Sequence, residues 1–382
     1  MRILLITDGI MPFVTGGMQQ HSYYLAKYLT LNNCKVTLVH CVYNKDLPDE
    51  KDLNAHLFSN VEKVFKVITL SFPVSFKFPG HYIYNSWRYS KLVYEAVKND
   101  LDRFDFIYVK GFSGWQLLRL RSKAMNHPPI GINFHGLNMF LPTNGLKLIL
   151  SNLLFRPLVR FNLKKSDYVF SYGGKVTPTI ISTGVPRKKI IEIPTGIESR
   201  FVVNENIIKV NSKLKFLFVG RNDPLKGIDE LFKALKSVNP SLIDFEFIGP
   251  IPKKLVQNNI KYHGLISNMK DIFNIMDQCD VLILPSYSEG MPNVILEAMS
   301  RGLIIIATDV GAVNILVSSK NGILIKDPKH ENILKAIKSL IASDRKSLLK
   351  MKFFSLKLVK NSFTWEKVVN YTFTMIKSLL MK

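Results

Sequence analysis

Short hydrophobic runs alternate along the chain with longer segments in which apolar and polar positions recur at helical spacing. The predicted strands are apolar over nearly their whole length and cover residues 2–7, 35–41, 106–109, 130–134 and 168–171, then 214–220, 244–249, 280–285 and 303–307. The predicted helices cover residues 17–31, 86–99, 145–163, 226–238, 268–278 and 292–301. Because strands that lack polar alternation are buried on both faces, the pattern predicts α/β layers in which helices cover parallel sheets.

The strand and helix series runs twice, which predicts two Rossmann-like, doubly wound domains. The first is expected over residues 1–198 and the second over residues 214–362, which suits a chain of 382 residues. Residues 199–213 are polar and have no regular period, so they are predicted to be a linker. A helical segment at 363–382 follows the second domain and is expected to cross back to the first.

Composition excludes several classes of protein. Hydrophobic residues make up 47% of the chain and charged residues 21%, so packed cores are expected and global disorder is not. Three cysteines without a Cys-x-x-Cys pair argue against a disulfide framework or a thiolate zinc site and favour a reducing compartment. The longest stretch without a charged residue, 124–146, contains His, Pro and Asn and does not fit a membrane span. The first residues are too short and too soon charged for a signal peptide, which predicts a cytoplasmic protein or one peripheral to the cytoplasmic face of a membrane.

The segment 285–312 carries the clearest chemical signal. A predicted strand ends at Pro285, a loop follows, and Pro292 stands where the first helical residue is expected. The backbone N–H groups of Gly290 and Met291 would then face an anion at the start of this helix. The segment therefore predicts a phosphate-binding loop.

Two carboxylates accompany this loop. Glu289 lies in the loop and Glu297 lies eight residues later on the predicted helix. A carboxylate can accept two hydrogen bonds from a vicinal diol, so the pair suits the recognition of sugar hydroxyls beside a phosphate. An isolated pair of this kind could equally be a capping residue and a surface residue. The glycine turns that follow, at Gly302 and Gly311, favour the functional interpretation.

A second cluster of charge follows the first strand of the second domain. Arg221 and Lys226 are expected at the carboxyl edge of a parallel sheet, where such sheets bind ligands. Both side chains could hold a diphosphate and stabilise charge on a leaving group. The alternative is ordinary ion pairing within the loop, of Arg221 with Asp223 or of Lys226 with Asp229 or Glu230.

The first domain offers two candidates. Gly16 and Gly17 stand between its first strand and first helix, where they allow the backbone to approach a ligand phosphate closely. The loop is not a Gly-x-Gly-x-x-Gly fingerprint, so a nicotinamide cofactor is not supported. His135 follows a buried strand, where an isolated histidine is more often structural than functional; His21 and His263 are expected to be structural.

The sequence SEGMPNVILEAMSRG around Glu289 and Glu297 closely resembles the E-x7-E signature of the retaining glycosyltransferases of family 4. The Leu-Glu-Ala and the later TDVGA turn agree, and the resemblance extends in order over nearly the whole chain. It implies the GT-B fold, in which two Rossmann-like domains face each other across a cleft.

The resemblance also implies a role for each candidate. Glu289 would contact the transferred sugar, and Glu297 would contact the ribose of the nucleotide. Arg221 and Lys226 would hold the donor diphosphate beside the amides of Gly290 and Met291. Gly16 and Gly17 match the loop that closes over the donor phosphates, although Met18, Gln19 and Gln20 replace the charged residue that often follows, and His135 would position the donor sugar.

The charge of the chain is unevenly distributed. The formal net charge is +23, and residues 106–191 contain thirteen Lys or Arg residues with Asp167 as their one acidic residue. Within this stretch the basic amphipathic segment 146–165 could lie on an anionic membrane, or it could be a helix that faces the core and points its cations to water. No nucleic-acid recognition motif accompanies the charge, so nucleic acid is not an expected partner.

These features and the resemblance to family 4 together imply a metal-independent, retaining glycosyltransferase of the hexosyltransferase type. A UDP- or GDP-sugar is the expected donor, and no cofactor or metal is expected. The acceptor is expected to be a saccharide or a lipid-linked saccharide of a bacterial-type surface polysaccharide or lipopolysaccharide pathway. The alternatives are a nucleotide-sugar epimerase or a phosphorylase on the same fold, or a non-catalytic protein that binds membranes or polyanions.

Overall fold

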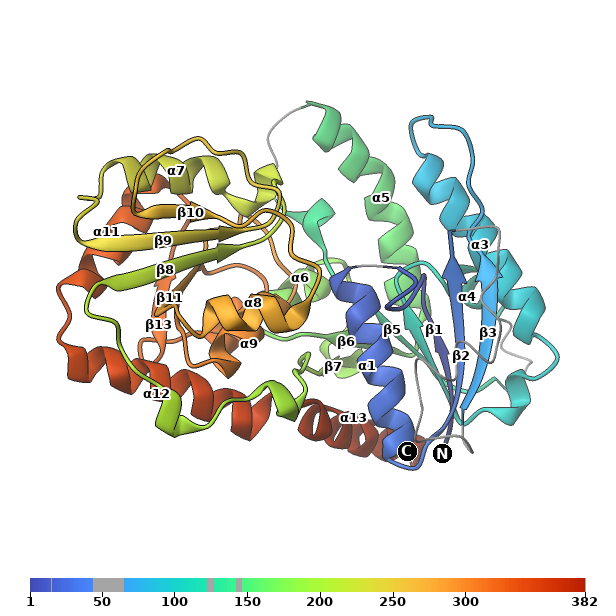
Figure 1. Ribbon diagram of the computed structural model, residues 1–382. Helices are drawn as coiled ribbons and strands as arrows, with labels where there is room; N and C mark the ends of the chain where they lie inside the picture. The colour runs from blue at the N-terminus through green and yellow to red at the C-terminus, as the bar shows by residue number, and fades with distance from the viewer. Residues whose placement is uncertain (15, 44–64, 122–126, 142–145, 382) are drawn as a thin grey trace. The chain divides into compact units, whose positions relative to one another are not determined.

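The computed structural model describes residues 1–14, 16–43, 65–121, 127–141 and 146–381 (Figure 1). The chain forms two compact units. Unit 1 comprises Met1–Tyr172, Val176–Pro194 and Val368–Lys382, and unit 2 comprises Gly173–Lys175 and Thr195–Lys367.

Unit 1 is built on a seven-stranded parallel sheet with the order β3-β2-β1-β4-β5-β6-β7. The strands are β1 (Arg2–Ile6), β2 (Lys35–Val42), β3 (Phe65–Ser71), β4 (Phe106–Lys110), β5 (Ile130–Asn133), β6 (Tyr168–Ser171) and β7 (Ile190–Glu192). In register, Ile3 lies between Val36 of β2 and Phe106 of β4, and all three side chains are buried. The strand order reverses at β1 and β4, so the sheet is doubly wound, and ligands of such sheets bind at the carboxyl ends of the strands near this point.

The helices of unit 1 lie between these strands in the chain, apart from the C-terminal helix α13. They are α1 (Gly17–Leu31), α3 (His81–Val97), α4 (Trp115–Leu120), α5 (Leu146–Lys165), α6 (Val176–Ser182) and the part of α13 (Trp365–Leu380) that begins at Val368. Right-handed crossovers place α3, α4 and α5 on one face of the sheet, where α4 packs against both neighbours (Figure 1).

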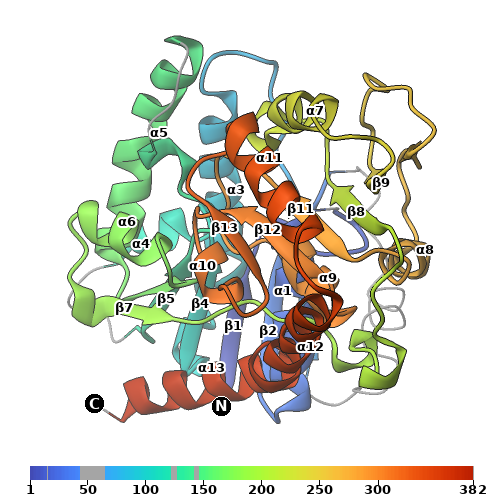
Figure 2. The same ribbon diagram turned by 90° about the vertical axis from the view of Figure 1, so that its left-hand side faces the viewer.

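Unit 2 repeats the architecture with a six-stranded parallel sheet, in the order β10-β9-β8-β11-β12-β13 (Figure 2). Its strands are β8 (Leu214–Val219), β9 (Ile243–Ile248), β10 (Ile260–Tyr262), β11 (Val281–Leu284), β12 (Ile304–Thr308) and β13 (Gly322–Ile325). Its helices are α7 (Ile228–Lys236), α8 (Met269–Met276), α9 (Asn293–Ser300), α10 (Val313–Leu316), α11 (His330–Ile341) and α12 (Arg345–Ser362). Phenylalanine and isoleucine side chains from the sheet, such as Phe216, Phe245 and Ile283, form a core with Leu231 of α7 and Ile337 of α11.

The segment 199–213, predicted as a linker, is part of unit 2. The Val203 amide donates to the Ser300 carbonyl at 3.0 Å, and the Asn211 side chain donates to the carboxylate of Asp280 at 2.8 Å. Asp280 is fully buried and also pairs with Lys352 at 3.0 Å. A buried carboxylate is stable only when donors satisfy it, and Asn211 is one of the donors to Asp280. The segment 199–213 is therefore held against unit 2 and is not a free linker, which its polar composition could not show.

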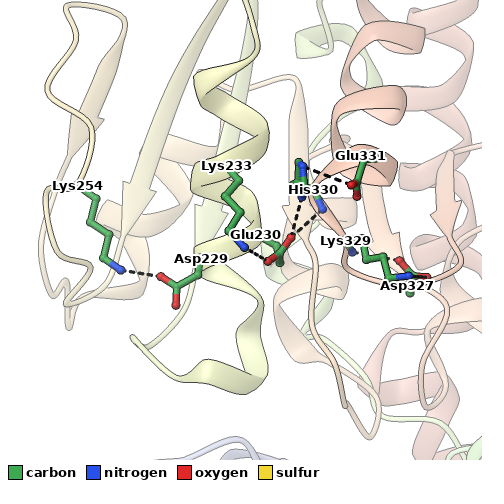
Figure 3. Close-up of polar contacts among 8 residues, drawn as sticks. All are labelled: Asp229, Glu230, Lys233, Lys254, Asp327, Lys329, His330 and Glu331. Atoms are coloured by element: carbon green, nitrogen blue, oxygen red, sulfur yellow. Dashed lines mark hydrogen bonds and ion pairs between the residues drawn. The ribbon is translucent and has the colours of Figure 1, made fainter. Parts of the chain in front are cut away.

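Polar contacts at the surface fix helix α7, which follows the loop of Arg221 and Lys226 (Figure 3). Glu230 accepts hydrogen bonds from the backbone N–H and from Nδ1 of His330 at 3.0 and 3.1 Å, and it also pairs with Lys233. Asp229 pairs with Lys254 at 2.6 Å. The bonds to His330 join the first turn of α7 to the first turn of α11, and both acidic residues of α7 are engaged away from Lys226.

Candidate active site

Two loops of unit 2 are held against each other at the carboxyl ends of the neighbouring strands β8 and β11. The Tyr287 amide, in the loop after β11, donates to the Leu225 carbonyl, in the loop after β8, at 2.8 Å. Gly227 has φ +67°, and a Cβ atom there would lie 2.0 Å from the Pro285 carbonyl oxygen. Glycine at this position therefore allows a contact between the two loops that any other residue would obstruct.

This contact brings Lys226 and Glu289 together. Lys226 Nζ lies 2.6 Å from Glu289 Oε1, and the two side chains are 23% and 11% exposed. The partners considered from the sequence, Asp229 and Glu230, pair elsewhere. An ammonium group and a carboxylate next to the predicted phosphate-binding loop can bind a group that carries both anionic oxygens and hydroxyls.

Arg221 is exposed on the same loop, and its side chain has no ion pair or hydrogen bond with any residue that the structure describes. Asp223, its possible partner in sequence, instead accepts a hydrogen bond from the Leu225 amide at 2.9 Å. The guanidinium group is thus available for a bidentate contact with an anionic ligand.

The loop of Gly290 and Met291 is shaped by backbone contacts with the turn at Gly311. The Ala312 amide donates to the Gly290 carbonyl at 2.7 Å, and a Cβ atom on Gly311 (φ +57°) would lie 2.2 Å from the Glu289 carbonyl oxygen. Met291 is buried, and its Sδ accepts a hydrogen bond from the Thr195 amide. Within the described ranges the Gly290 and Met291 amides donate to no protein group, so both remain available for an anion.

Helix α9 begins at Asn293, one residue later than predicted, with Pro292 as its N-cap residue. Glu297 lies on this helix and is partly buried, and burial raises the pKa of its carboxyl group to about 7. No hydrogen bond or ion pair to this carboxylate is found among the described residues. The two glutamates therefore differ: Glu289 is held by Lys226, whereas Glu297 is desolvated without a counter-ion.

In unit 1, Gly16 is the N-cap residue of α1 and Gly17 is its first residue. Two residues later, Gln19 Nε2 donates to Asp8 Oδ1 at 3.3 Å, at the carboxyl end of β1. Burial raises the pKa of Asp8 to about 6. The polar residues that replace a charged one after the glycines thus contact the sheet edge through Gln19.

His135 follows β5 and joins a buried polar cluster that the sequence interpretation missed. Its Nδ1 lies 2.8 Å from the Tyr172 hydroxyl, which donates to Asn133 Oδ1 at 3.2 Å. Lys110, the last residue of β4, contacts Asn133 Oδ1 at 2.7 Å and His21 Nδ1 at 3.0 Å. A lysine that ends an otherwise apolar strand, in FIYVK, is the one signal that could have indicated this cluster.

Two histidines were expected to be structural. His263 contacts the buried carboxylate of Glu246 at 2.6 Å, which accounts for its place in unit 2. His21 is buried beside Lys110 and its ring lies 6.3 Å from that of His135, so it belongs to the cluster of unit 1.

The candidates thus fall into two groups, one in each unit. Unit 1 holds Gly16, Gly17 and His135, and unit 2 holds Arg221, Lys226, Glu289, Gly290, Met291 and Glu297. Among the described residues, no group of three or more His, Cys, Asp or Glu side chains is placed to hold a metal ion.

Models of two protein families match the chain, one on each side of residue 202. The family described as Glycosyltransferase Family 4 matches residues 15–201, and the family described as Glycosyl transferases group 1 matches residues 213–343. An uncharacterized glycosyltransferase of Methanocaldococcus jannaschii is 27% identical over 336 residues, which is 84% of this chain and 88% of the relative. The N,N'-diacetylbacillosaminyl-diphospho-undecaprenol alpha-1,3-N-acetylgalactosaminyltransferase of Campylobacter jejuni is 24% identical over 244 residues, 56% of this chain and 62% of the relative.

Solved structures match over almost the whole chain. Sucrose-phosphate synthase from Thermosynechococcus elongatus has a TM-score of 0.78 at 16% identity and covers 100% of this chain and 99% of its own. Anabaena HepE, solved in complex with UDP-glucose, has a TM-score of 0.68 at 16% identity and covers 99% of each chain.

Two doubly wound units and these structural matches show the GT-B fold, which confirms the predicted fold class. Glycosyltransferase family models match both halves of the chain, one of them Glycosyltransferase Family 4 over residues 15–201, and this confirms the resemblance to that family. The prediction of a glycosyltransferase is also confirmed, and the comparisons do not favour an epimerase, a phosphorylase or a non-catalytic binding protein.

Proposed function

We propose that the chain is a retaining glycosyltransferase that takes a sugar from a nucleotide-sugar donor bound by unit 2. The observation that carries this proposal is the Lys226–Glu289 pair, 2.6 Å apart. The exposed Arg221 lies on the same loop as Lys226, and the available amides of Gly290 and Met291 follow Glu289 in the chain. Cations and amides suit a diphosphate, and the two carboxylates suit sugar and ribose hydroxyls. UDP-glucose in the matching HepE structure supports a UDP-sugar, and a GDP-sugar is the alternative.

The reaction depends on stabilising the leaving diphosphate. As the bond between the sugar C1 and the diphosphate oxygen breaks, negative charge builds on that oxygen, and Arg221 and Lys226 supply compensating charge without a metal. The acceptor hydroxyl forms the new bond to C1 on the same face, and its proton passes to the departing phosphate oxygen. Glu289, held by Lys226, orients the sugar through its hydroxyls.

Binding of the donor can be measured by the thermal unfolding midpoint in a panel of UDP-, GDP- and ADP-sugars. A ligand that binds the folded protein raises the midpoint by mass action, by an amount that corresponds to about 2.7 kcal/mol at a hundredfold excess over Kd. We expect one nucleotide class to raise it and Glu297→Ala to weaken the effect. If no nucleotide sugar at millimolar concentration shifts the midpoint, the proposed donor site is wrong.

We further propose a lipid-linked saccharide as the acceptor, presented at an anionic membrane. The Campylobacter relative is named for a diphospho-undecaprenol acceptor, which supports this substrate class. None of the helices in the described part of the chain is long and apolar enough to cross a bilayer. We propose that a surface of the folded protein makes the contact with the membrane.

Unit 1 has such a surface, the apolar ridge, formed by α5 and the segment before α3. Its side chains are more than half exposed and are Leu150, Leu153, Leu154, Val74 and Phe76. The ring of Tyr82, at the start of α3, lies 6.0 Å from that of Phe155 of α5, and Figures 1 and 2 both show α5 and the start of α3 as neighbours. Exposed cations flank the ridge at Lys77, Arg160, Lys164 and Lys165. Apolar side chains beside cations fit the interface of an anionic lipid bilayer.

Sedimentation with vesicles tests the ridge. The protein should sediment with vesicles that contain phosphatidylglycerol, and sedimentation should fall at least tenfold with phosphatidylcholine vesicles or high salt, because the attraction of the cations is screened. Leu150→Glu/Leu154→Glu should abolish it, whereas Val256→Glu, at an exposed apolar residue of unit 2, should not. Equal sedimentation of both variants would contradict the assignment of the ridge.

A further inference from the structure

The polar cluster of unit 1 lies at the carboxyl ends of three adjacent central strands. Lys110 ends β4, Asn133 ends β5, and Tyr172 follows β6, while His21 reaches the cluster from α1. All four side chains are at most 3% exposed. Buried polar groups at the ligand-binding edge of a doubly wound sheet require a physical reason, because burial is costly unless each hydrogen bond is satisfied.

The orientation of the Asn133 amide is fixed by its neighbours. Its nitrogen, Nδ2, lies 2.9 Å from the carbonyl oxygen of Phe170, which can only accept a hydrogen bond. The amide oxygen, Oδ1, must therefore face the opposite side, where it receives Lys110 Nζ at 2.7 Å and the Tyr172 hydroxyl at 3.2 Å.

This orientation decides how the Tyr172 hydroxyl is used. A phenol carries one hydrogen, and if Tyr172 gave it to His135, the lone pairs of its oxygen and of Asn133 Oδ1 would face each other at 3.2 Å in a buried site. Donation to Asn133 avoids this repulsion. The phenol oxygen then accepts, and the group 2.8 Å away, Nδ1 of His135, must be the donor.

Burial keeps His135 neutral, and the neighbouring Lys110 adds to this effect. Burial, and then the positive charge of Lys110, lower the pKa of His135 to about 3. The same two causes lower the pKa of His21. Burial also lowers the pKa of Lys110, and the carboxylate of Asp8 opposes this only in part. A neutral imidazole with its hydrogen on Nδ1 carries a lone pair on Nε2, and Nε2 has no hydrogen-bond partner among the described residues.

We propose that Lys110, Asn133 and Tyr172 form a positioning relay that fixes His135 as the Nδ1-protonated tautomer, so that Nε2 accepts a hydrogen bond from a sugar hydroxyl. This inference rests on the proposed function, because the hydroxyl that it assigns to His135 belongs to a substrate of the proposed transferase. A lone pair attracts a hydroxyl donor and repels an anionic oxygen. His135 therefore recognises a hydroxyl of the donor or acceptor sugar and does not stabilise the diphosphate, which is the task of Arg221 and Lys226.

The tautomer can be measured directly by long-range ¹H–¹⁵N correlation spectra of the full chain labelled at histidine, without any substrate. The His135 signals are identified by their loss in His135→Gln. At pH 7 we expect a protonated Nδ1 and an unprotonated Nε2. In Tyr172→Phe the Nδ1 hydrogen loses its acceptor, and we expect a mixture of both tautomers.

The control is Tyr168→Phe, the same substitution at the first residue of β6. The ring of Tyr168 stacks on Phe106, so this variant should leave the His135 signals unchanged. A structural role alone would change the unfolding midpoint of Tyr172→Phe without changing the tautomer. The proposal is overturned if wild-type His135 carries its hydrogen on Nε2, or if Tyr172→Phe leaves the tautomer unaltered. Because no substrate is used, these outcomes are independent of the donor panel that tests the proposed function.

Discussion

Lys226→Met is expected to lower the turnover of the enzyme by about a hundredfold while leaving the fold intact. The loss of one preorganised group that stabilises developing negative charge typically costs a factor of about 10² to 10³ in rate. Arg221→Ala should also lower turnover by at least about tenfold. Because the Arg221 side chain has no structural partner in the described residues, its removal should affect ligand binding and catalysis but not the fold. The measurement is the rate of nucleoside diphosphate release from the donor identified in the thermal panel.

The matched control for this experiment is Lys254→Met. Lys254 also forms an ion pair with a carboxylate of unit 2, Asp229, but 51% and 74% of these side chains are exposed. Exposed pairs contribute about 1 kcal/mol or less to stability, so turnover should stay within about twofold of wild type. Wild-type turnover in Lys226→Met would contradict the role that we assign to Lys226.

A double substitution separates two explanations of a slow Lys226→Met variant. Lys226 could act on the diphosphate, or it could act solely by holding the Glu289 carboxylate, which is 11% exposed and would be left without its partner. If holding Glu289 were the whole role, Lys226→Met/Glu289→Gln would be no slower than Glu289→Gln. We expect the double variant to be slower than Glu289→Gln by at least about tenfold, because the diphosphate still lacks its cation.

The strands that the hydrophobic pattern predicted are the nine interior strands of the two sheets, and the four that it missed are the edges. The missed strands are β3, β7, β10 and β13. An interior strand is covered by helices and by two neighbours, so its sequence is continuously apolar, as in VLIL of β11. An edge strand has one neighbour and tolerates polar residues, as in IKY of β10, and it therefore gives no clear pattern.

In the candidate site, the sequence could indicate the functional residues but not the residues that they contact. Arg221, Lys226, Glu289 and Glu297 could be selected because their spacing resembles a family motif, but the partner of Lys226 could not. Sequence reasoning considered acidic residues within four positions, whereas Glu289 lies 63 residues away. Lys110 similarly meets Asn133 and His21 at separations of 23 and 89 residues. Contacts of this range depend on how the strands are ordered in the sheet, which no local pattern encodes.

Affinity for the nucleotide-sugar donor should fall as the pH is lowered through 7, and Glu297 should be the cause. Burial raises the pKa of Glu297 from 4.5 to about 7 in the free protein. A ribose diol donates to the ionised carboxylate, so the donor binds the deprotonated form and the proton competes with it. Between pH 8 and pH 6 the measured Kd for the donor should rise by up to about tenfold, since one pH unit corresponds to a factor of ten in this competition. A nucleotide sugar is the suitable probe because its diphosphate has no terminal phosphate group that titrates in this range.

Glu297→Gln tests the assignment in two ways. The amide cannot ionise, so calorimetry should give a donor affinity about tenfold weaker at pH 8 and independent of pH. The control Glu331→Gln, at a largely exposed glutamate of α11, should behave as wild type.

The stability of the free protein should also change in Glu297→Gln. Because the folded-state pKa of Glu297 lies above the unfolded value, ionisation in the folded state costs free energy, and wild-type stability falls as pH rises from about 4.5 to about 7. Glu297→Gln removes that cost, so its unfolding midpoint should exceed that of wild type at pH 8 and converge with it near pH 4.5. If the affinity of Glu297→Gln still depends on pH, another group titrates and the assignment to Glu297 is wrong. If its unfolding midpoint at pH 8 is lower than that of wild type, the ionised Glu297 carboxylate stabilises the free protein, which contradicts the cost that we assign to its burial.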